Sequence, residues 1–192
     1  MISPNPAHNA AIQIERIGRL LRAGANSCGL NPAQWDALRY LSRANRFSRN
    51  PSAAAAWLAT TKGTVSQTLL ALERAGLIAR RSDANDRRGT QIEVTAAGKD
   101  LLERADPMSA LMGPLGDLPP LHASLMSQAL SRVLQFMLAE SGRQAFGSCA
   151  TCVHFTSGHP GALTPATGQC GLLKAAIAAE ALSEICVHYE AA

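Results

Sequence analysis

Four of the five cysteines lie after residue 148, in a C-terminal segment with few large apolar side chains. They follow the order Cys149-x2-Cys152-x17-Cys170-x15-Cys186. A Cys-x2-Cys pair at a turn can direct two thiolates toward one centre, and two further cysteines complete the four soft ligands that zinc or an iron–sulfur cluster needs. Because so short a segment has little core of its own, we expect a bound metal centre to supply its cohesion.

The length and composition of the chain are those of a folded protein with either one domain or two small domains. The chain has 192 residues, of which 47% are hydrophobic, enough for a buried core. It contains no apolar run long enough to span a membrane, and residues 1–6 lack the charged start of a secretory signal. We therefore expect a cytoplasmic protein without a membrane partner. Thiols stay reduced there, which favours metal ligation over disulfides.

The charge is divided unevenly between the two halves. Residues 1–105 hold 15 Lys and Arg against 8 Asp and Glu, whereas residues 106–192 hold 3 against 6. A basic N-terminal half favours contacts with the phosphates of a nucleic acid through counterion release. Charge alone is weak evidence, because many soluble proteins are basic without binding nucleic acid.

The basic half contains several helix signals. Apolar residues at helical spacing predict a long amphipathic first helix over residues 10–25. Asn31 and Pro32 form a typical helix start for a second helix that runs through Leu41. Ser52 is the expected cap of a short Ala-rich third helix, 53–59, with Trp57 packed inward.

A fourth helix is predicted over residues 61–76, with one apolar and one polar face. Val65, Leu69 and Leu72 share the apolar face. The opposite edge carries Lys62, Thr64, Ser66 and Gln67. Short polar side chains beside a lysine suit insertion into a major groove, where hydroxyls and amides contact base edges, although a solvated face has the same composition.

A β-hairpin is predicted next, with arginines at its tip. Strands at 77–81 and 90–94 flank the polar turn 82–89, and Thr95 caps a further helix to Ala105. Within the turn, Asp86 is expected to position a neighbouring arginine, because a carboxylate beside DNA phosphate would be repelled. The order of elements is helix, helix, helix, helix, hairpin and helix.

Over residues 10–105 the chain resembles the MarR family of winged helix-turn-helix regulators. The resemblance is carried by 34–41, 61–69, 72–78, 86–88 and 94–98. It implies a homodimer whose two recognition helices enter successive major grooves of a pseudo-palindromic site in double-stranded DNA, with a wing arginine in the minor groove. The DNA-binding residues implied are Lys62, Thr64, Ser66, Gln67, Arg87 and Arg88, with Asp86 organising the wing.

The second half supplies a long helix and the cysteine tail. Residues 106–120 contain four prolines and predict a linker or broken helix, and an apolar stripe over 121–144 predicts a helix for the dimer interface or for the protein's own core. The expected fold is mainly α with a small β-hairpin wing and long dimerisation helices. We expect DNA-binding residues 1–105, linker and dimerisation residues 106–146, and a metal-binding tail, 147–192.

The identity of the metal is left open by the cysteine spacing. Structural zinc sites often use two close cysteine pairs, whereas here one pair precedes two distant single cysteines, which favours an iron–sulfur cluster, of the 4Fe–4S type. The segments 149–155, 168–172 and 186–189 are also similar to the cysteine layout of high-potential iron–sulfur proteins. Zinc is the alternative, and a metal-free tail is a third. Cys170 is expected to begin a helix over 171–182.

A few further side chains belong to the candidate chemistry. His154, His159 and His188 lie near the cysteines and could each replace one as a ligand, although a loop histidine is more often hydrogen-bonded or solvated. Cys28 follows the first helix, where a structural thiol is the simpler interpretation and a redox-active thiol the other.

Three functions remain compatible with these features. The first is a dimeric transcriptional regulator gated by a cluster that senses redox state, oxygen, nitric oxide or iron. The second is the same regulator with a structural zinc and a small-molecule ligand. The third is an electron-transfer or metal-storage protein on a winged-helix scaffold. The sequence contains no nucleophile elbow, phosphate-binding glycine loop or paired catalytic carboxylates, so an enzyme is not expected.

Overall fold

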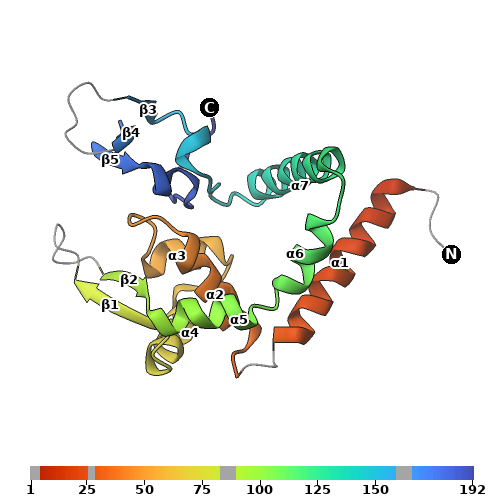
Figure 1. Cartoon of the computed structure of the whole chain (residues 1–192), viewed down its shortest axis with the longest axis horizontal. Helices are drawn as coiled ribbons and strands as arrows, with labels where there is room; N and C mark the ends of the chain where they lie inside the picture. Colours follow the sequence, from red (N-terminus) through yellow and green to blue (C-terminus); the bar gives the residue numbers. More distant parts are fainter. Residues whose placement is uncertain (1–4, 26–28, 83–89, 159–165) are drawn as a thin grey trace.

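The computed structural model describes residues 5–25, 29–82, 90–158 and 166–192. Within these residues the chain is mainly helical, with a two-stranded hairpin and a separate three-stranded sheet in the tail (Figure 1). The mainly α fold with a small β wing, as predicted from the sequence, is therefore confirmed.

The N-terminal half forms a winged-helix core. Its elements are α2 (Pro32–Arg43), α3 (Pro51–Trp57), α4 (Lys62–Arg74), β1 (Ile78–Ser82), β2 (Thr90–Val94) and α5 (Ala96–Ala105). β1 and β2 pair antiparallel, with Ile78 opposite Val94. The centre is filled by fully buried side chains, including Trp35, Leu38 and Leu69. Such burial, rather than helix propensity, supplies most of the stability of short helices.

Capping side chains set where these helices begin. Asn31 and Gln34 form a reciprocal capping box at α2, and Thr61 and Thr95 accept backbone N–H bonds at α4 and α5. These starts match the sequence prediction.

The third helix begins earlier than predicted. Its cap is Asn50, which accepts a hydrogen bond from the backbone N–H of Ala53, and Pro51 occupies the first helical position. The cap prediction at Ser52 is therefore wrong. Three alanines of this helix face the core. Trp57 is 38% exposed and lies partly outside the core. Its ring instead contacts the rings of Tyr40 and Phe146.

Three helices stand outside this core (Figure 1): α1 (Pro6–Gly24), α6 (Ser109–Gly116) and α7 (Pro120–Glu140). α6 is a helix with Pro114 near its end, where a linker or broken helix was predicted. Neither α1 nor α7 buries a residue within the single chain. Their exposed apolar side chains include Ile14, Leu20, Leu125, Val133 and Phe136.

The cysteine tail forms a small antiparallel sheet in the order β3-β4-β5. Its elements are η2 (Cys149–Thr151), β3 (Phe155–Ser157), β4 (Ala166–Cys170), β5 (Ala175–Ala178) and η3 (Ala179–Ser183). The predicted helix over 171–182 is wrong. Lys174 turns the chain with φ 49°, Cys170 pairs with Ala175, and Ile177 is buried. Tertiary pairing thus overrides the high helix propensity of alanine.

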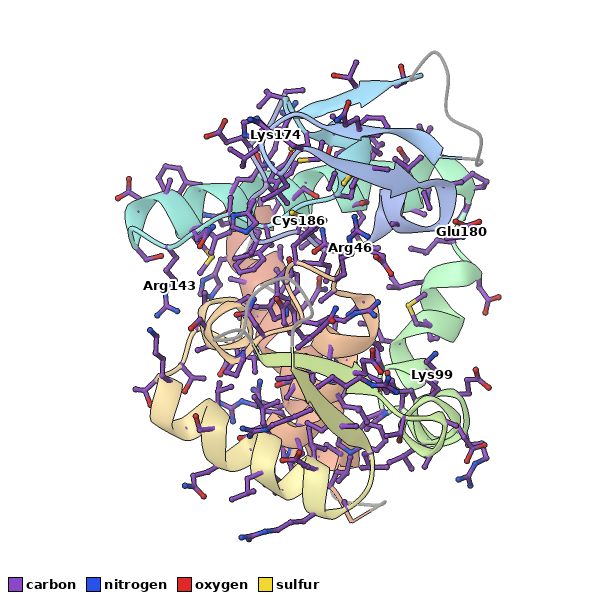
Figure 2. The ribbon with its side chains drawn as sticks, turned by 90° about the vertical axis from the view of Figure 1, so that its left-hand side faces the viewer. Arg46, Lys99, Arg143, Lys174, Glu180 and Cys186 are labelled. Carbon is purple, nitrogen blue, oxygen red and sulfur yellow. The ribbon has the colours of Figure 1, made fainter. Side chains whose placement is uncertain are left out.

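The tail lies against one side of the winged-helix core, and α4 lies on the opposite side (Figures 1 and 2). Phe146, Ile185 and Val187 pack against the core residues. The tail therefore leaves the exposed face of α4 uncovered.

A glycine in the tail sheet provides a test of this packing. A Cβ built at Gly168 would lie 2.3 Å from the backbone oxygen of Thr156, so Gly168→Ala forces β3 and β4 apart. We expect a loss of about 1–3 kcal/mol in the free energy of unfolding, measured by denaturant titration. Gly116→Ala is the control, because no atom lies within 4 Å of its added Cβ. Equal stability of the two variants would contradict the β3–β4 packing.

Candidate DNA-binding face and cysteine site

The exposed edge of α4 carries the polar residues expected for a recognition helix. Lys62, Thr64, Ser66 and Gln67 are all exposed, whereas Val65, Leu69 and Leu72 are buried on the opposite face. The amphipathic orientation predicted from the sequence is confirmed.

The hydroxyls on this edge are partly engaged within the helix. Ser66 Oγ donates to the Lys62 carbonyl at 2.8 Å, and Thr64 Oγ1 lies 2.9 Å from Thr61 Oγ1. Their remaining lone pairs can still accept hydrogen bonds. Within the described residues, Lys62 and Gln67 make no side-chain hydrogen bond, so they offer the free donors on this face.

The arginines at the base of the hairpin are paired with carboxylates. Arg80 Nε lies 3.1 Å from Glu73, and Arg81 Nε lies 2.7 Å from Glu93. Both pairs neutralise charge beside the strands, so these arginines are less available to phosphate than free ones. The predicted wing residues, Asp86, Arg87 and Arg88, lie outside the described residues.

Backbone pairing brings the four tail cysteines into one region. Gly147, two residues before Cys149, pairs with Cys186, whose N–H donates to the Gly147 carbonyl at 2.8 Å. Cys170 pairs with Phe155, whose N–H donates to the Cys152 carbonyl at 3.1 Å. Segments that are separated by many positions in the sequence therefore lie next to one another.

The cysteines also interact through charge. Burial raises the pKa of the Cys149 thiol, and the negative charges of Cys186, Cys152 and Cys170, in that order, raise it further. Cys149 and Cys186 are buried, at 8% and 7% exposure, and all four thiols are free. Clustered thiolates repel one another, and a cation among them removes that cost, so the donor set suits a soft metal or cluster.

The thiols do not form a closed site for a single ion as they stand. Among the described residues, no group of three His, Cys, Asp or Glu side chains is placed to hold one metal ion. The cofactor prediction therefore stays a prediction.

The predicted alternative ligands are only partly described. His154 Nε2 lies 3.1 Å from a Glu190 carboxylate oxygen, and His188 is exposed. The His154 contact agrees with the simpler interpretation of a hydrogen-bonded loop histidine. His159 and Cys28 fall in the undescribed segments.

The tail and the winged helix share a hydrogen-bonded joint that was not predicted. Ile185 N–H donates to the Arg43 carbonyl at 2.8 Å, and the Ile185 carbonyl accepts from Asn45 N–H at 2.9 Å. Val187 N–H donates to Ser48 Oγ at 2.8 Å. We call residues 43–48 together with 185–187 the tail joint. No periodicity in the sequence indicates such pairing, since the two segments of the joint are more than a hundred residues apart.

Aromatic packing supports the same joint. Phe146 lies edge-on to Tyr40 and Trp57, with ring centroids 6.3 and 5.2 Å away. Tyr40 donates from its hydroxyl to the Ser48 carbonyl at 2.8 Å. Burial, and then the charge of Cys186, raises the pKa of Tyr40 well above its usual range.

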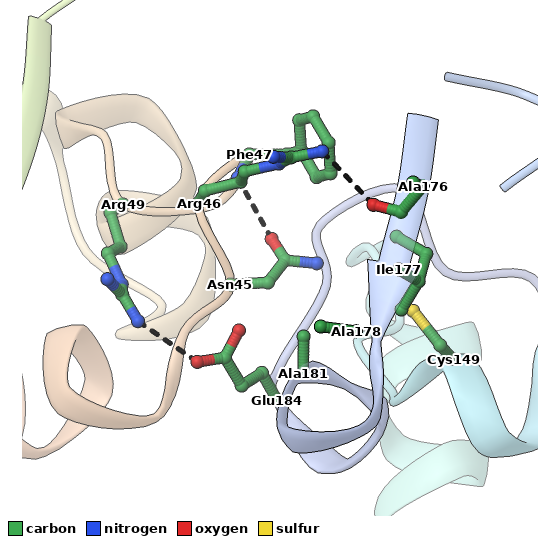
Figure 3. A pocket seen from close by; sticks show the side chains of 10 residues that line it. All are labelled: Asn45, Arg46, Phe47, Arg49, Cys149, Ala176, Ile177, Ala178, Ala181 and Glu184. Atoms are coloured by element: carbon green, nitrogen blue, oxygen red, sulfur yellow. Dashed lines mark hydrogen bonds and ion pairs between the residues drawn. The ribbon is translucent and has the colours of Figure 1, made fainter. Parts of the chain in front are cut away.

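A cavity of about 210 Å³ opens where the tail meets the loop after α2 (Figure 3). Arg49 forms a 3.1 Å ion pair with Glu184 across it, and Arg46 donates to the Ala176 carbonyl at 3.2 Å. Cys149 lines the far side. An ion pair and a hydrogen bond therefore connect the loop after α2 to the tail around this cavity.

The arrangement of helices and wing defines a winged helix-turn-helix fold. Residues 29–89 match the MarR family model. The structure of MepR bound to DNA, from S. aureus, is 23% identical and covers 70% of this chain and 99% of its own, with a TM-score of 0.54. CouR from Rhodococcus jostii RHA1, bound to p-coumaroyl-CoA, is 21% identical and covers 68% and 95%, with a TM-score of 0.56.

These likenesses show the winged helix-turn-helix fold. No curated protein matches the chain. None of the helices within the described ranges is long and apolar enough to cross a membrane.

Proposed function

We propose that this protein is a dimeric, DNA-binding transcriptional regulator whose DNA affinity is controlled by an iron–sulfur cluster on Cys149, Cys152, Cys170 and Cys186. The observation that carries the proposal is the tail joint, which fixes the Cys186 segment directly to the winged helix. A cofactor site attached to the scaffold of the recognition helix is positioned to alter DNA binding.

The DNA-binding part rests on the exposed edge of α4. Lys62 and Gln67 are exposed there, and α4 lies on the side of the core opposite the tail (Figure 2). The basic N-terminal half supplies the charge that attracts phosphate. MepR, of similar fold, is seen bound to DNA. The sequence adds Arg87 and Arg88 as wing contacts to the minor groove.

Dimerisation is supported by the unburied apolar faces of α1 and α7. A single chain leaves Leu125, Val133 and Phe136 more than half exposed. Surfaces of this kind on long helices mark association sites. A two-fold dimer would present its recognition helices to a pseudo-palindromic site about one helical turn apart.

The four cysteines would hold the cofactor, and a bound cluster would supply a redox-active, oxidant-sensitive centre. The wide cysteine spacing and the mutual electrostatic influence of the four thiols support this choice. Zinc on the same residues is the alternative, with a structural role.

A second candidate function is regulation by a small molecule, with a structural zinc ion bound in the tail. A cavity of about 340 Å³ lies beside α2 and α6, lined by Arg39, Arg43, Met108 and Met112 among others. CouR, of similar fold, is seen with p-coumaroyl-CoA. The cofactor measurement below separates the two candidates.

Specific DNA binding should depend on both basic elements. Arg87→Ala should weaken binding to a selected duplex by about 1–3 kcal/mol, because a groove contact is lost, and Lys62→Ala should reduce affinity mainly through phosphate. Fluorescence anisotropy at fixed salt measures both. Lys174→Ala is the matched control, since Lys174 lies in the tail, away from α4 (Figure 2). Unchanged affinity in both test variants would reject these residues as DNA contacts.

Anaerobically purified protein should be brown, with a broad absorption band at about 400 nm, and should contain iron and acid-labile sulfide. Serine at Cys149, Cys152, Cys170 or Cys186 should remove the colour, because each substitution removes a thiolate ligand. Cys28→Ser is the control and should keep it.

Colourless protein with about one zinc per chain would reject the cluster and favour the second candidate. Coloured protein without specific affinity for any duplex DNA would instead favour an electron-transfer or storage role.

A further inference from the structure

The Cys186 segment is held on both sides by the winged helix. Ile185, before the cysteine, makes two backbone hydrogen bonds to residues 43 and 45, and Val187, after it, donates to Ser48 Oγ at 2.8 Å. Cys186 is itself buried, at 7% exposure. Cys186 therefore lies in a segment that is fixed to this loop, not in a free chain end.

Ser48 connects this loop to the helix-turn-helix. It is fully buried, and its Oγ accepts from Val187 N–H while donating to Asn45 Oδ1 at 2.7 Å. Its carbonyl accepts from the Tyr40 hydroxyl at 2.8 Å and from Asn50 N–H at 2.9 Å. Because Asn50 is the N-cap of α3, one buried residue joins the tail, α2 and the start of α3.

The same loop also meets the wing. The next residue, Arg49, accepts Ile92 N–H of β2 on its carbonyl at 2.7 Å, and its side chain bonds the Ala44 carbonyl at 2.6 Å. α3 contacts the recognition helix α4 directly. β2 pairs with β1, which also contacts α4. Residues 43–50 are thus shared by the cysteine tail, the helix-turn-helix and the wing.

We propose that Ser48 and Tyr40 are positioning residues that transmit the state of the cysteine site to the DNA-binding helices through the hydrogen bonds Val187 to Ser48 and Tyr40 to Ser48. The proposal rests on the proposed gating of DNA affinity and names the route within a single chain. It requires no direct contact between the tail and DNA, in agreement with the position of α4 on the far side of the core (Figure 2).

The test compares full-length variants in the cofactor-loaded and cofactor-free states. Ser48→Ala removes the acceptor of Val187 N–H, and Tyr40→Phe removes one hydroxyl while keeping the ring that packs on Trp57. Ser42→Ala is the matched control, because its hydroxyl donates only to the Arg39 carbonyl of its own helix. Visible absorption reports cofactor loading, and circular dichroism reports folding.

The measured quantity is the ratio of the DNA dissociation constants in the two states. In the wild-type protein and in Ser42→Ala, the two dissociation constants should differ by about 5- to 150-fold, the usual range of allosteric coupling. In Ser48→Ala and Tyr40→Phe, this difference between the dissociation constants should fall below about twofold. Both variants should still load the cofactor and should bind DNA like the wild-type protein in the cofactor-free state. If Ser48→Ala does not fold, Tyr40→Phe decides the outcome.

Each other outcome overturns a stated part of the account. Loaded, folded Tyr40→Phe that keeps the wild-type ratio rejects the transmission route and leaves the proposed gating intact. Loss of the cofactor from Tyr40→Phe assigns Tyr40 to cofactor retention instead. A ratio of one in the wild-type protein rejects the gating, and the route with it.

Discussion

The pairing of residues 185–187 with residues 43–48 is the interaction on which the arrangement of this molecule depends. A typical intramolecular hydrogen bond contributes about 0.5–1.5 kcal/mol net. Ile185 and Val187 together make three, with donor–acceptor distances of 2.8–2.9 Å. Their sum is a few kcal/mol, similar to the 1–3 kcal/mol of an ordinary allosteric coupling. The packing of Phe146 on Tyr40 and Trp57 adds an apolar contact to the same joint.

This joint gives one loop three partners. The loop after α2 ends at the N-cap of α3, and its Arg49 carbonyl accepts a hydrogen bond from the wing strand β2. Glu184 of the tail pairs with the Arg49 side chain. A small change in the cysteine site can therefore alter the start of the helix-turn-helix and the base of the wing together. The exposed face of α4 lies on the opposite side of the core from the tail.

Much of the winged helix could be predicted from the sequence because its signals are local. Asn31 and Thr95 cap their helices as expected, and the 3.6-residue period of Val65, Leu69 and Leu72 identifies the buried face of α4. The start of α3 was missed by two residues, because Asn50 and Ser52 are both good caps and Pro51 decides between them.

The tail was less predictable because its structure comes from contacts distant in sequence. Residues 175–178 are three alanines and one isoleucine, a strong helix pattern, yet they form β5 because they pair with β4 and bury Ile177. The joint use of the four cysteines as ligands stays a prediction, because among the described residues no three such side chains are placed around one ion. The roles of Ser48 and Asn45 were not predicted, since a buried polar residue is recognised only by its partners.

Hydrogen exchange in the joint tests the central claim most directly. In full-length protein, peptides carrying the amides of Asn45, Ile185 and Val187 should exchange more slowly with the cofactor bound than without it, while the Thr95 amide, bonded to Leu77, should not change. That result is predicted because a cofactor bound to Cys186 would hold this residue between two of these hydrogen bonds. Equal exchange in both states, in protein whose DNA affinity does depend on the cofactor, would contradict the account.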